Sequence, residues 1–404
     1  MSTPIVKTKI LFISTYPPKK CGIASFTNDL MNAIRQEISD DTAIDVCALD
    51  KKLYKELYES KVSLFMDSFQ FDSCLETARK INNDPTIKLL CIEHEFGLYG
   101  GELGEYLLGF LSLIEKPFII RFHTVIPSPS LKMLTVVQSI ALLADKLVVM
   151  TGNSATILKE DYNVSADKLI IIPHGTHAYS TINANQLKSK YDLNNRKVLT
   201  TFGLLSPNKG IEKGILAMKE ISKALPDSIY LVIGQTHPNL IQNEGESYRN
   251  YLKQLIIENG LQENVRLINE YVPTHNLMEY LALTDVYLFT SKDPNQAVSG
   301  TFLYAMGSGC PIISNSFVLA KEMLDDTTGV ILVTDQPEEL AENAIRILQN
   351  HRLQQDMSAN ARAKTRNTTW EKVGKKHVQL FSSILGINLS PTGALPQYDT
   401  QNSL

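Results

Sequence analysis

Short runs of apolar residues alternate with longer amphipathic segments along the first half of the chain. Residues 25–38 have helical spacing, with one apolar face formed by Phe26, Leu30, Ile34 and Ile38. The apolar runs are predicted to be buried strands, at residues 10–14, 88–92, 118–122, 147–150 and 169–172. Near-continuous apolar strands separated by helices are typical of a parallel sheet that is covered on both faces.

The same pattern starts again after a polar stretch, 179–196, which we interpret as a linker between domains. A helix after the first strand of this second set carries Ile211, Ile215 and Met218, and further helices are predicted from residue 337 to about 385. The strands are predicted at residues 198–202, 229–233, 265–268, 286–289, 311–314 and 330–333.

The length of 404 residues also favours two domains, because a single core rarely grows beyond about 300 residues. We predict a doubly wound α/β domain at 1–180 and a second at 181–367, facing a central cleft. A helix at about 368–387 is expected to pack back on the first domain, and residues 388–404 are expected to be a disordered tail. Ligands of such sheets bind at the carboxyl ends of the strands.

The composition excludes several classes of protein. A formal net charge of −4 argues against a nucleic-acid-binding protein, which normally has a basic face. No apolar run approaches the roughly 20 residues of a membrane span, and the N-terminal run is too short for a signal peptide. The five cysteines form no C-x-x-C pair and indicate reduced thiols. We expect a cytoplasmic protein, and a peripheral position at the inner face of a membrane stays open.

Three loops contain residues suited to binding a phosphate. The loop 15–24 includes Gly22 and Ile23 at the expected start of a helix, where free N–H groups favour anions. The loop 202–210 carries Lys209 as its second-last residue, which is well placed to neutralise a diphosphate. Each also has a purely structural interpretation, the first as an ordinary proline-rich loop and the second as a surface lysine beside a capping glycine.

The third loop, 293–311, leads into a short helix. Ser299, Gly300 and Thr301 would present amides and hydroxyls to a phosphate or a sugar, although serine and threonine are also common helix caps.

Histidines and glutamates follow other predicted strands. His123 comes directly after the strand 118–122, and His94 and Glu95 follow the strand 88–92. No third ligand stands at a suitable spacing from His94 and Glu95, so a zinc site is not favoured. Polar groups at several strand ends suit a sugar pocket instead.

Together these motifs resemble glycosyltransferase family 4, whose members are retaining nucleotide-sugar transferases with the GT-B double-Rossmann fold. The resemblance runs from residue 10 to about 385. It implies that Lys209 contacts the donor phosphate, that loop 15–24 approaches the sugar and pyrophosphate, and that His123 contacts the donor sugar. Ser206, in the same loop as Lys209, is counted among the donor-binding residues. Glu95 is a candidate base or acceptor-binding residue.

The chain departs from the family pattern at the positions of its two glutamates and of one arginine. Gln296 and Tyr304 stand where the family has glutamates that bind the sugar and the ribose, and Leu204 replaces the arginine. A tyrosine hydroxyl offers no bidentate acceptor for ribose hydroxyls. We interpret the changes as a variant donor site.

The resemblance implies transfer of mannose or glucose from a GDP- or UDP-linked donor to a saccharide or lipid-linked acceptor, without a cofactor or a metal ion. The alternatives are a glycoside phosphorylase, a nucleotide-sugar epimerase, or a sugar-nucleotide-binding protein without catalytic activity.

Overall fold

The computed structural model describes residues 8–51, 56–180 and 182–391, and it divides into two compact units. The first unit joins Met1–Gly175 to the C-terminal segment Trp370–Leu404, and the second is Thr176–Thr369. The predicted division at 180/181 lies five residues later than this one. Thr176 belongs to the second unit because its backbone N–H donates to the carbonyl of Thr368 at 2.7 Å.

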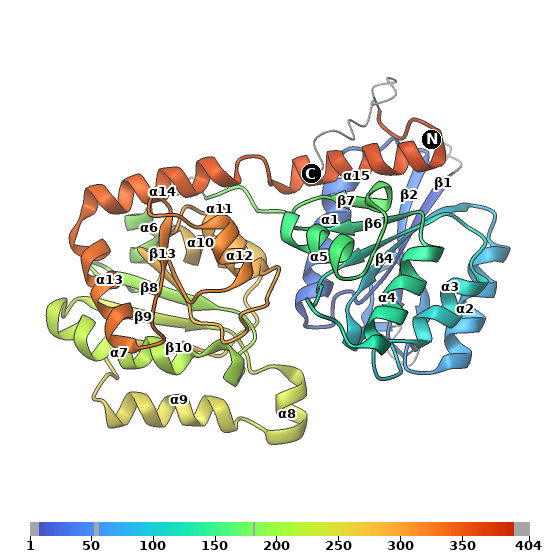
Figure 1. Ribbon diagram of the computed structural model, residues 1–404. Coiled ribbons are helices and arrows are strands. Elements are labelled where there is room, and N and C mark those ends of the chain that lie inside the picture. Colours follow the sequence, from blue (N-terminus) through green and yellow to red (C-terminus); the bar gives the residue numbers. More distant parts are fainter. Residues whose placement is uncertain (1–7, 52–55, 181, 392–404) are drawn as a thin grey trace. The chain divides into compact units, whose positions relative to one another are not determined.

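The first unit is built on a seven-stranded parallel sheet with the order β3-β2-β1-β4-β5-β6-β7 (Figure 1). Strands β2 and β3 follow on one side of β1, and β4 to β7 follow on its other side. The strand order therefore reverses between β1 and β4. The strands are β1 (Thr8–Ser14), β2 (Thr42–Leu49), β3 (Val62–Met66), β4 (Ile87–His94), β5 (Phe118–Phe122), β6 (Lys146–Val149) and β7 (Leu169–Ile171).

Helices cover both faces of this sheet. One face packs against α2 (Phe71–Asn83), α3 (Tyr106–Leu113), α4 (Leu131–Leu143) and α5 (Gly152–Glu160). On the other face α1 (Gly22–Arg35) packs against α15 (Trp370–Leu385), the helix that returns from the C-terminal end of the chain (Figure 1). Their close packing depends on Gly374, since a Cβ atom there would lie 2.8 Å from the backbone of Ala33.

The second unit has a six-stranded parallel sheet with the order β10-β9-β8-β11-β12-β13. Its strand order reverses between β8 and β11. The strands are β8 (Lys197–Phe202), β9 (Ser228–Ile233), β10 (Val265–Ile268), β11 (Val286–Phe289), β12 (Ile312–Ser314) and β13 (Gly329–Ile331).

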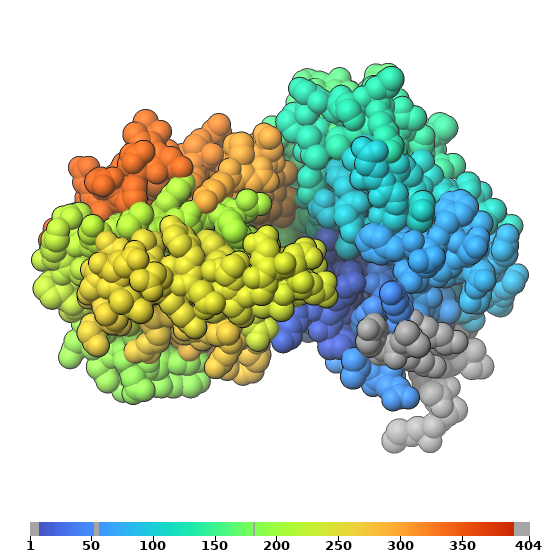
Figure 2. Space-filling view, turned by 90° about the horizontal axis from the view of Figure 1, so that it is seen from below, coloured from blue at the N-terminus to red at the C-terminus, as the bar shows by residue number. Residues whose placement is uncertain are grey.

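The helices of the second unit also form two layers. One core lies under α7 (Ile211–Ala224), α9 (Ser247–Glu258) and α13 (Pro337–Gln349), and the other lies under α6 (Ala184–Lys190), α10 (Thr274–Ala282), α11 (Gly300–Gly307) and α12 (Val318–Met323). The remaining helices are α8 (Pro238–Glu244) and α14 (His351–Thr365). In Figure 2 the residues of α8 and α9, in yellow, cover one face of this unit.

The structure corrects the predicted elements in four places. Helix α1 begins and ends three residues earlier than the predicted 25–38, because Cys21 caps it. The predicted linker 179–196 contains helix α6, whose Leu187 is buried in the core. Strands β2 and β3 were not predicted. The predicted tail 388–404 begins too early, since Leu389 is buried and its carbonyl accepts the N–H of Ser39 at 2.9 Å; residues 392–404 lie outside the described residues.

Two features are absent from the described residues. None of their helices has both the length and the apolar content that crossing a membrane requires. No group of three or more His, Cys, Asp or Glu side chains in the same ranges is arranged to hold a metal ion.

Candidate functional site

A small pocket of the second unit lies where the strand order reverses, at the carboxyl ends of β8 and β11. Such switch points are the usual ligand sites of open α/β sheets. Two of the predicted phosphate-binding residues, Lys209 and Thr301, line the same pocket. The other lining residues are Thr201, Phe202, Tyr287, Phe289, Thr290 and Ser291. The lining therefore combines hydroxyl groups and one lysine with three aromatic side chains.

The turn after β8 fits this place only because of Gly210. Its φ of 60° lies in the left-handed region, and a Cβ atom there would be 2.3 Å from the carbonyl oxygen of Thr290. The Thr290 hydroxyl in turn donates to the carbonyl of Lys209 at 2.8 Å. The loop after β8 and the loop after β11 are thus bound to each other, which holds Lys209 at the pocket.

Among the residues that line this pocket, Lys209 is the one that carries a charge. Burial lowers the pKa of its ammonium group, and no carboxylate of the described residues opposes that effect. No hydrogen bond or ion pair is recorded for its Nζ within the described ranges. Its neighbours differ: Lys292 lies 2.7 Å from Glu212, and Lys213 is paired with Asp335. A partly buried cation without a counterion favours an anionic ligand.

Helix α11 begins at the same pocket. The Ser299 hydroxyl caps it by accepting from the N–H of Phe302 at 3.3 Å, and it lies 3.1 Å from the Thr301 hydroxyl. The amides of Gly300 and Thr301 stand in the first turn, where helix geometry provides no intrahelical acceptor. Amides and the positive end of the helix dipole favour a phosphate here.

The other predicted donor residues have local roles in the structure. Gln296 shapes its loop, since its Oε1 accepts from Ser291 at 3.2 Å and its Nε2 donates to the carbonyl of Val298 at 3.1 Å. Ser206 accepts the N–H of Lys209 through its carbonyl at 2.9 Å. Tyr304 is 9% exposed and belongs to the core, with its ring edge-on to His177.

In the first unit, the loops after β1 and β4 likewise lie where the strand order reverses. Cys21 caps α1, since its Sγ accepts from the N–H of Ala24 at 3.3 Å, and Thr15 Oγ1 lies 3.2 Å from the same sulfur. Gly22 and Ile23 therefore belong to the first turn of the helix, three residues before its predicted start, and their binding of a ligand stays a prediction. A Cβ atom at Gly22 would meet nothing within 4 Å, so this end of α1 is open.

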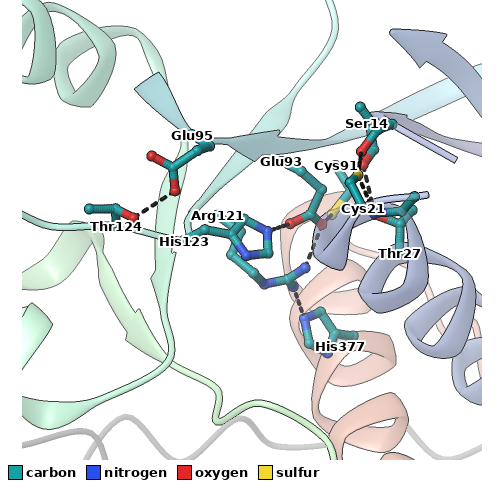
Figure 3. A network of polar contacts seen from close by, with 12 residues as sticks. Ser14, Cys21, Thr27, Cys91, Glu93, Glu95, Arg121, His123, Thr124 and His377 are labelled. Atoms are coloured by element: carbon teal, nitrogen blue, oxygen red, sulfur yellow. Dashed lines mark hydrogen bonds and ion pairs between the residues drawn. The ribbon is translucent and has the colours of Figure 1, made fainter. Parts of the chain in front are cut away.

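Beside these loops His123 belongs to a network of buried polar side chains (Figure 3). Its Nε2 lies 2.7 Å from Oε2 of Glu93, and Glu93 Oε1 accepts from Nη1 of Arg121 at 2.6 Å. Nη2 of Arg121 contacts Nε2 of His377, which comes from α15. The side chains of Glu93 and Arg121 have no exposed area, whereas that of His123 is 12% exposed. The network thus begins in the core and ends at the surface.

The charges of the network are fixed by their surroundings. Burial raises the pKa of Glu93, but the charge of Arg121 and the hydrogen bond from His123 outweigh it, so the pKa is lowered overall. Burial and the charge of Arg121 hold the pKa of His377 well below its usual value. Glu93 is therefore ionised and His377 is neutral at pH 7.

The side chains of Glu95 and His94 have surroundings of their own, although the His94 carbonyl accepts from the N–H of His123 at 3.0 Å. The Glu95 carboxylate accepts from the Thr124 hydroxyl at 2.6 Å and from the N–H of Phe96 at 3.1 Å (Figure 3). His94 is fully buried among aromatic rings, and neither ring nitrogen has a partner among the described residues. Burial and the nearby His123 lower the pKa of His94 to about 3, so it is a neutral core residue.

The sequence prediction missed Glu93, Arg121 and His377. The sequence does contain a signal for Glu93 and Arg121, because each is a charged residue inside an apolar strand. Charged side chains are almost never buried without a partner. Nothing local marks His377, which lies on one face of an ordinary amphipathic helix.

The second unit is similar to a known protein family. Residues 183–364 match the family model of glycosyl transferases group 1. An uncharacterized glycosyltransferase of Methanocaldococcus jannaschii is 25% identical over 203 residues, 49% of this chain and 48% of that protein. A GDP-mannose-dependent alpha-(1-6)-phosphatidylinositol monomannoside mannosyltransferase of Mycolicibacterium smegmatis is 23% identical over 36% of this chain and 37% of its own length. The matches span half or less of these curated relatives.

Solved structures extend the likeness to nearly the whole chain. Anabaena HepE, solved in complex with UDP and glucose, superposes with a TM-score of 0.73 at 16% identity, over 93% of this chain and all of that one. A sucrose-phosphate synthase from Thermosynechococcus elongatus gives a TM-score of 0.72 at 16% identity, over 94% and 99%. With its two parallel-sheet domains, the chain has the predicted GT-B fold.

Proposed function

Because the second unit carries the glycosyl transferases group 1 match, we propose that the chain is a retaining glycosyltransferase. It moves a hexose, mannose or glucose, from a nucleotide-diphosphate donor to a saccharide or glycolipid acceptor. The observation that carries this proposal is the ammonium group of Lys209, which has no partner among the described residues and shares one pocket with the first turn of α11.

The chemistry follows from the charge that develops on the leaving group. The bond between the anomeric carbon and the β-phosphate oxygen breaks, and the acceptor oxygen bonds to the same face of that carbon. The proton of the acceptor hydroxyl passes to the departing phosphate. Lys209 and the amides of Gly300 and Thr301 stabilise the phosphate charge, an electrostatic effect that is usually the largest contribution to catalysis.

The first unit supplies the residues for the sugar and the acceptor in this proposal. His123 contacts the transferred sugar, as the resemblance implies, and its partly exposed ring is held by Glu93. Glu95 binds the acceptor in this proposal, since each of its carboxylate oxygens accepts one hydrogen bond and keeps a lone pair for an acceptor hydroxyl. Gln296 acts on sugar binding through the shape of its loop.

The donor is proposed from the relatives. The mycobacterial relative is GDP-mannose-dependent, and the Anabaena structure holds UDP and glucose, so both nucleotides are candidates for this chain. A thermal-shift panel of nucleoside diphosphates identifies the base, because a ligand that binds the folded state raises the apparent stability.

The decisive experiment measures release of nucleoside diphosphate from GDP-mannose and from UDP-glucose, with and without saccharide acceptors. We expect acceptor-dependent release and a product with the anomeric configuration of the donor, as read by NMR. Turnover should survive treatment with EDTA, because Lys209 and amides carry the charge. No release from any donor would refute the proposal.

The same assay separates the alternatives. An epimerase changes the sugar without releasing it from the nucleotide, and a phosphorylase requires inorganic phosphate and no nucleotide. A protein that only binds shows a thermal shift without turnover.

A further inference from the structure

The buried pair of Glu93 and Arg121 needs an explanation beyond packing. The two residues are opposite each other in the register of β4 and β5, so both side chains point to the sheet face that α1 and α15 cover. Phe26 of α1 packs against the Arg121 guanidinium and against the His123 ring, each at 5.0 Å. Two apolar residues would fill this space without the cost of desolvating two charges. The pair therefore indicates a role in holding a neighbouring group.

The hydrogen bonds of the network have only one consistent set of directions. Nδ1 of His377 lies 2.7 Å from the carbonyl of Val373, so Nδ1 carries the proton and Nε2 accepts from Arg121. Arg121 can only donate, and it donates to Glu93. An ionised carboxylate can only accept, so Nε2 of His123 must donate to Glu93.

This direction leaves Nδ1 of a neutral His123 without a proton. No donor to Nδ1 is recorded among the described residues, and the His123 side chain retains 12% of its exposure. We infer that Glu93, Arg121 and His377 are positioning residues that fix His123 as the Nε2–H tautomer, so that its Nδ1 accepts a hydrogen bond from a substrate hydroxyl. The identity of that hydroxyl as one of the donor sugar rests on the proposed function.

The tautomer is measured directly by NMR on the full chain without substrate. Long-range ¹H–¹⁵N spectra of ¹⁵N-labelled protein distinguish a protonated from an unprotonated ring nitrogen. H123Q identifies the signals of His123, and H351Q, at an exposed residue of α14, is the matched control. We expect a protonated Nε2 and an unprotonated Nδ1. A proton on Nδ1, or a mixture of tautomers, would overturn the inference.

The double variant E93Q/R121M tests whether the network imposes this tautomer. It removes both buried charges together, so no unpaired charge remains to unfold the protein. We expect a urea midpoint near that of the wild type, a mixture of His123 tautomers, and a kcat/KM roughly three- to tenfold lower, the scale of one hydrogen bond. A single unchanged tautomer in the folded variant would show that the buried charges of Glu93 and Arg121 do not fix the tautomer of His123.

The two proposals fail in different ways. The wild-type spectrum requires neither substrate nor a folded variant, so it decides the tautomer in every case. A correct tautomer without glycosyl transfer refutes only the proposed function, and normal transfer with a proton on Nδ1 refutes only this inference.

Discussion

Replacing Lys209 by methionine separates the charge of this residue from its packing. Methionine keeps most of the aliphatic stem that lines the pocket and removes the ammonium group. Because Nζ has no recorded partner among the described residues, the substitution strands no carboxylate. Effects on catalysis therefore report the interaction with the ligand.

We expect the variant to lose about 10²–10³-fold in turnover, the cost of removing one preorganised charge-stabilising donor, or about 2.7–4 kcal/mol. A Coulomb estimate for a contact at hydrogen-bonding range lies at the upper end of this range. A unit charge about 4 Å from a phosphate oxygen gains about 4 kcal/mol at an effective dielectric constant near 20, which suits a partly buried group. Affinity for free nucleoside diphosphate should fall in the same direction.

The stability of the variant should change in the opposite sense. Burial lowers the pKa of Lys209 from its usual 10.5, so the unfolded chain binds this proton more tightly than the folded chain does. The charged lysine therefore costs stability at every pH below its folded pKa, and the cost disappears as the pH rises to 10.5. Without ligand at pH 7, the methionine variant should be at least as stable as the wild type.

Steady-state release of nucleoside diphosphate and urea unfolding at pH 7 measure the two effects. Lys213→Met is the matched control, since Lys213 follows one helical turn later and is already paired with Asp335. It should keep turnover close to that of the wild type. Unchanged kinetics in Lys209→Met, or an equal loss in both variants, would refute the reasoning.

Three further changes test other parts of the structure. Gln296→Ala should reduce discrimination between donor sugars and leave inhibition by free nucleoside diphosphate unchanged, as measured by competing donors and by inhibition constants. Gly374→Ala should destabilise the first unit by about 1–3 kcal/mol in urea unfolding, because its Cβ would lie 2.8 Å from the backbone of Ala33 and α1 would have to shift. The pKa of Glu93 is lowered from 4.5, so the stability it contributes is complete above pH 4.5 and is lost as the pH falls through its folded value. In urea unfolding between pH 7 and about pH 3, the wild type should therefore lose stability relative to E93Q/R121M as the pH falls below 4.5.

A different result would contradict each of these three predictions. Loss of nucleotide affinity in Gln296→Ala would show that the residue acts on the nucleotide rather than on the sugar. Gly152→Ala is the control for Gly374→Ala, because its Cβ would meet nothing within 4 Å; equal midpoints for the two would contradict the packing argument. A constant difference between E93Q/R121M and the wild type from neutral to acid pH would mean that Glu93 does not titrate with a lowered pKa.

The sequence by itself determined the alternation of strands and helices and the two-sheet architecture. These depend on local patterns, since buried strands are apolar runs and the helices show a 3.6-residue period. It also predicted the loop that carries Lys209 and the helix start at Gly300, because both follow buried strands and parallel strands end at one edge of a sheet. Strand β2 was missed because Asp45 interrupts its apolar run.

Only the tertiary structure decided which polar groups meet. Arg121 and His377 are 256 residues apart in the chain, and they touch because α15 returns to pack against α1. Lys209 likewise has no partner among the described residues because the fold places no carboxylate of the unit beside it. Hydrophobic periodicity specifies which face of a helix or strand is buried. The hydrogen-bond partner and the charge state of a buried polar side chain depend on packing between elements distant in sequence, which no local pattern encodes.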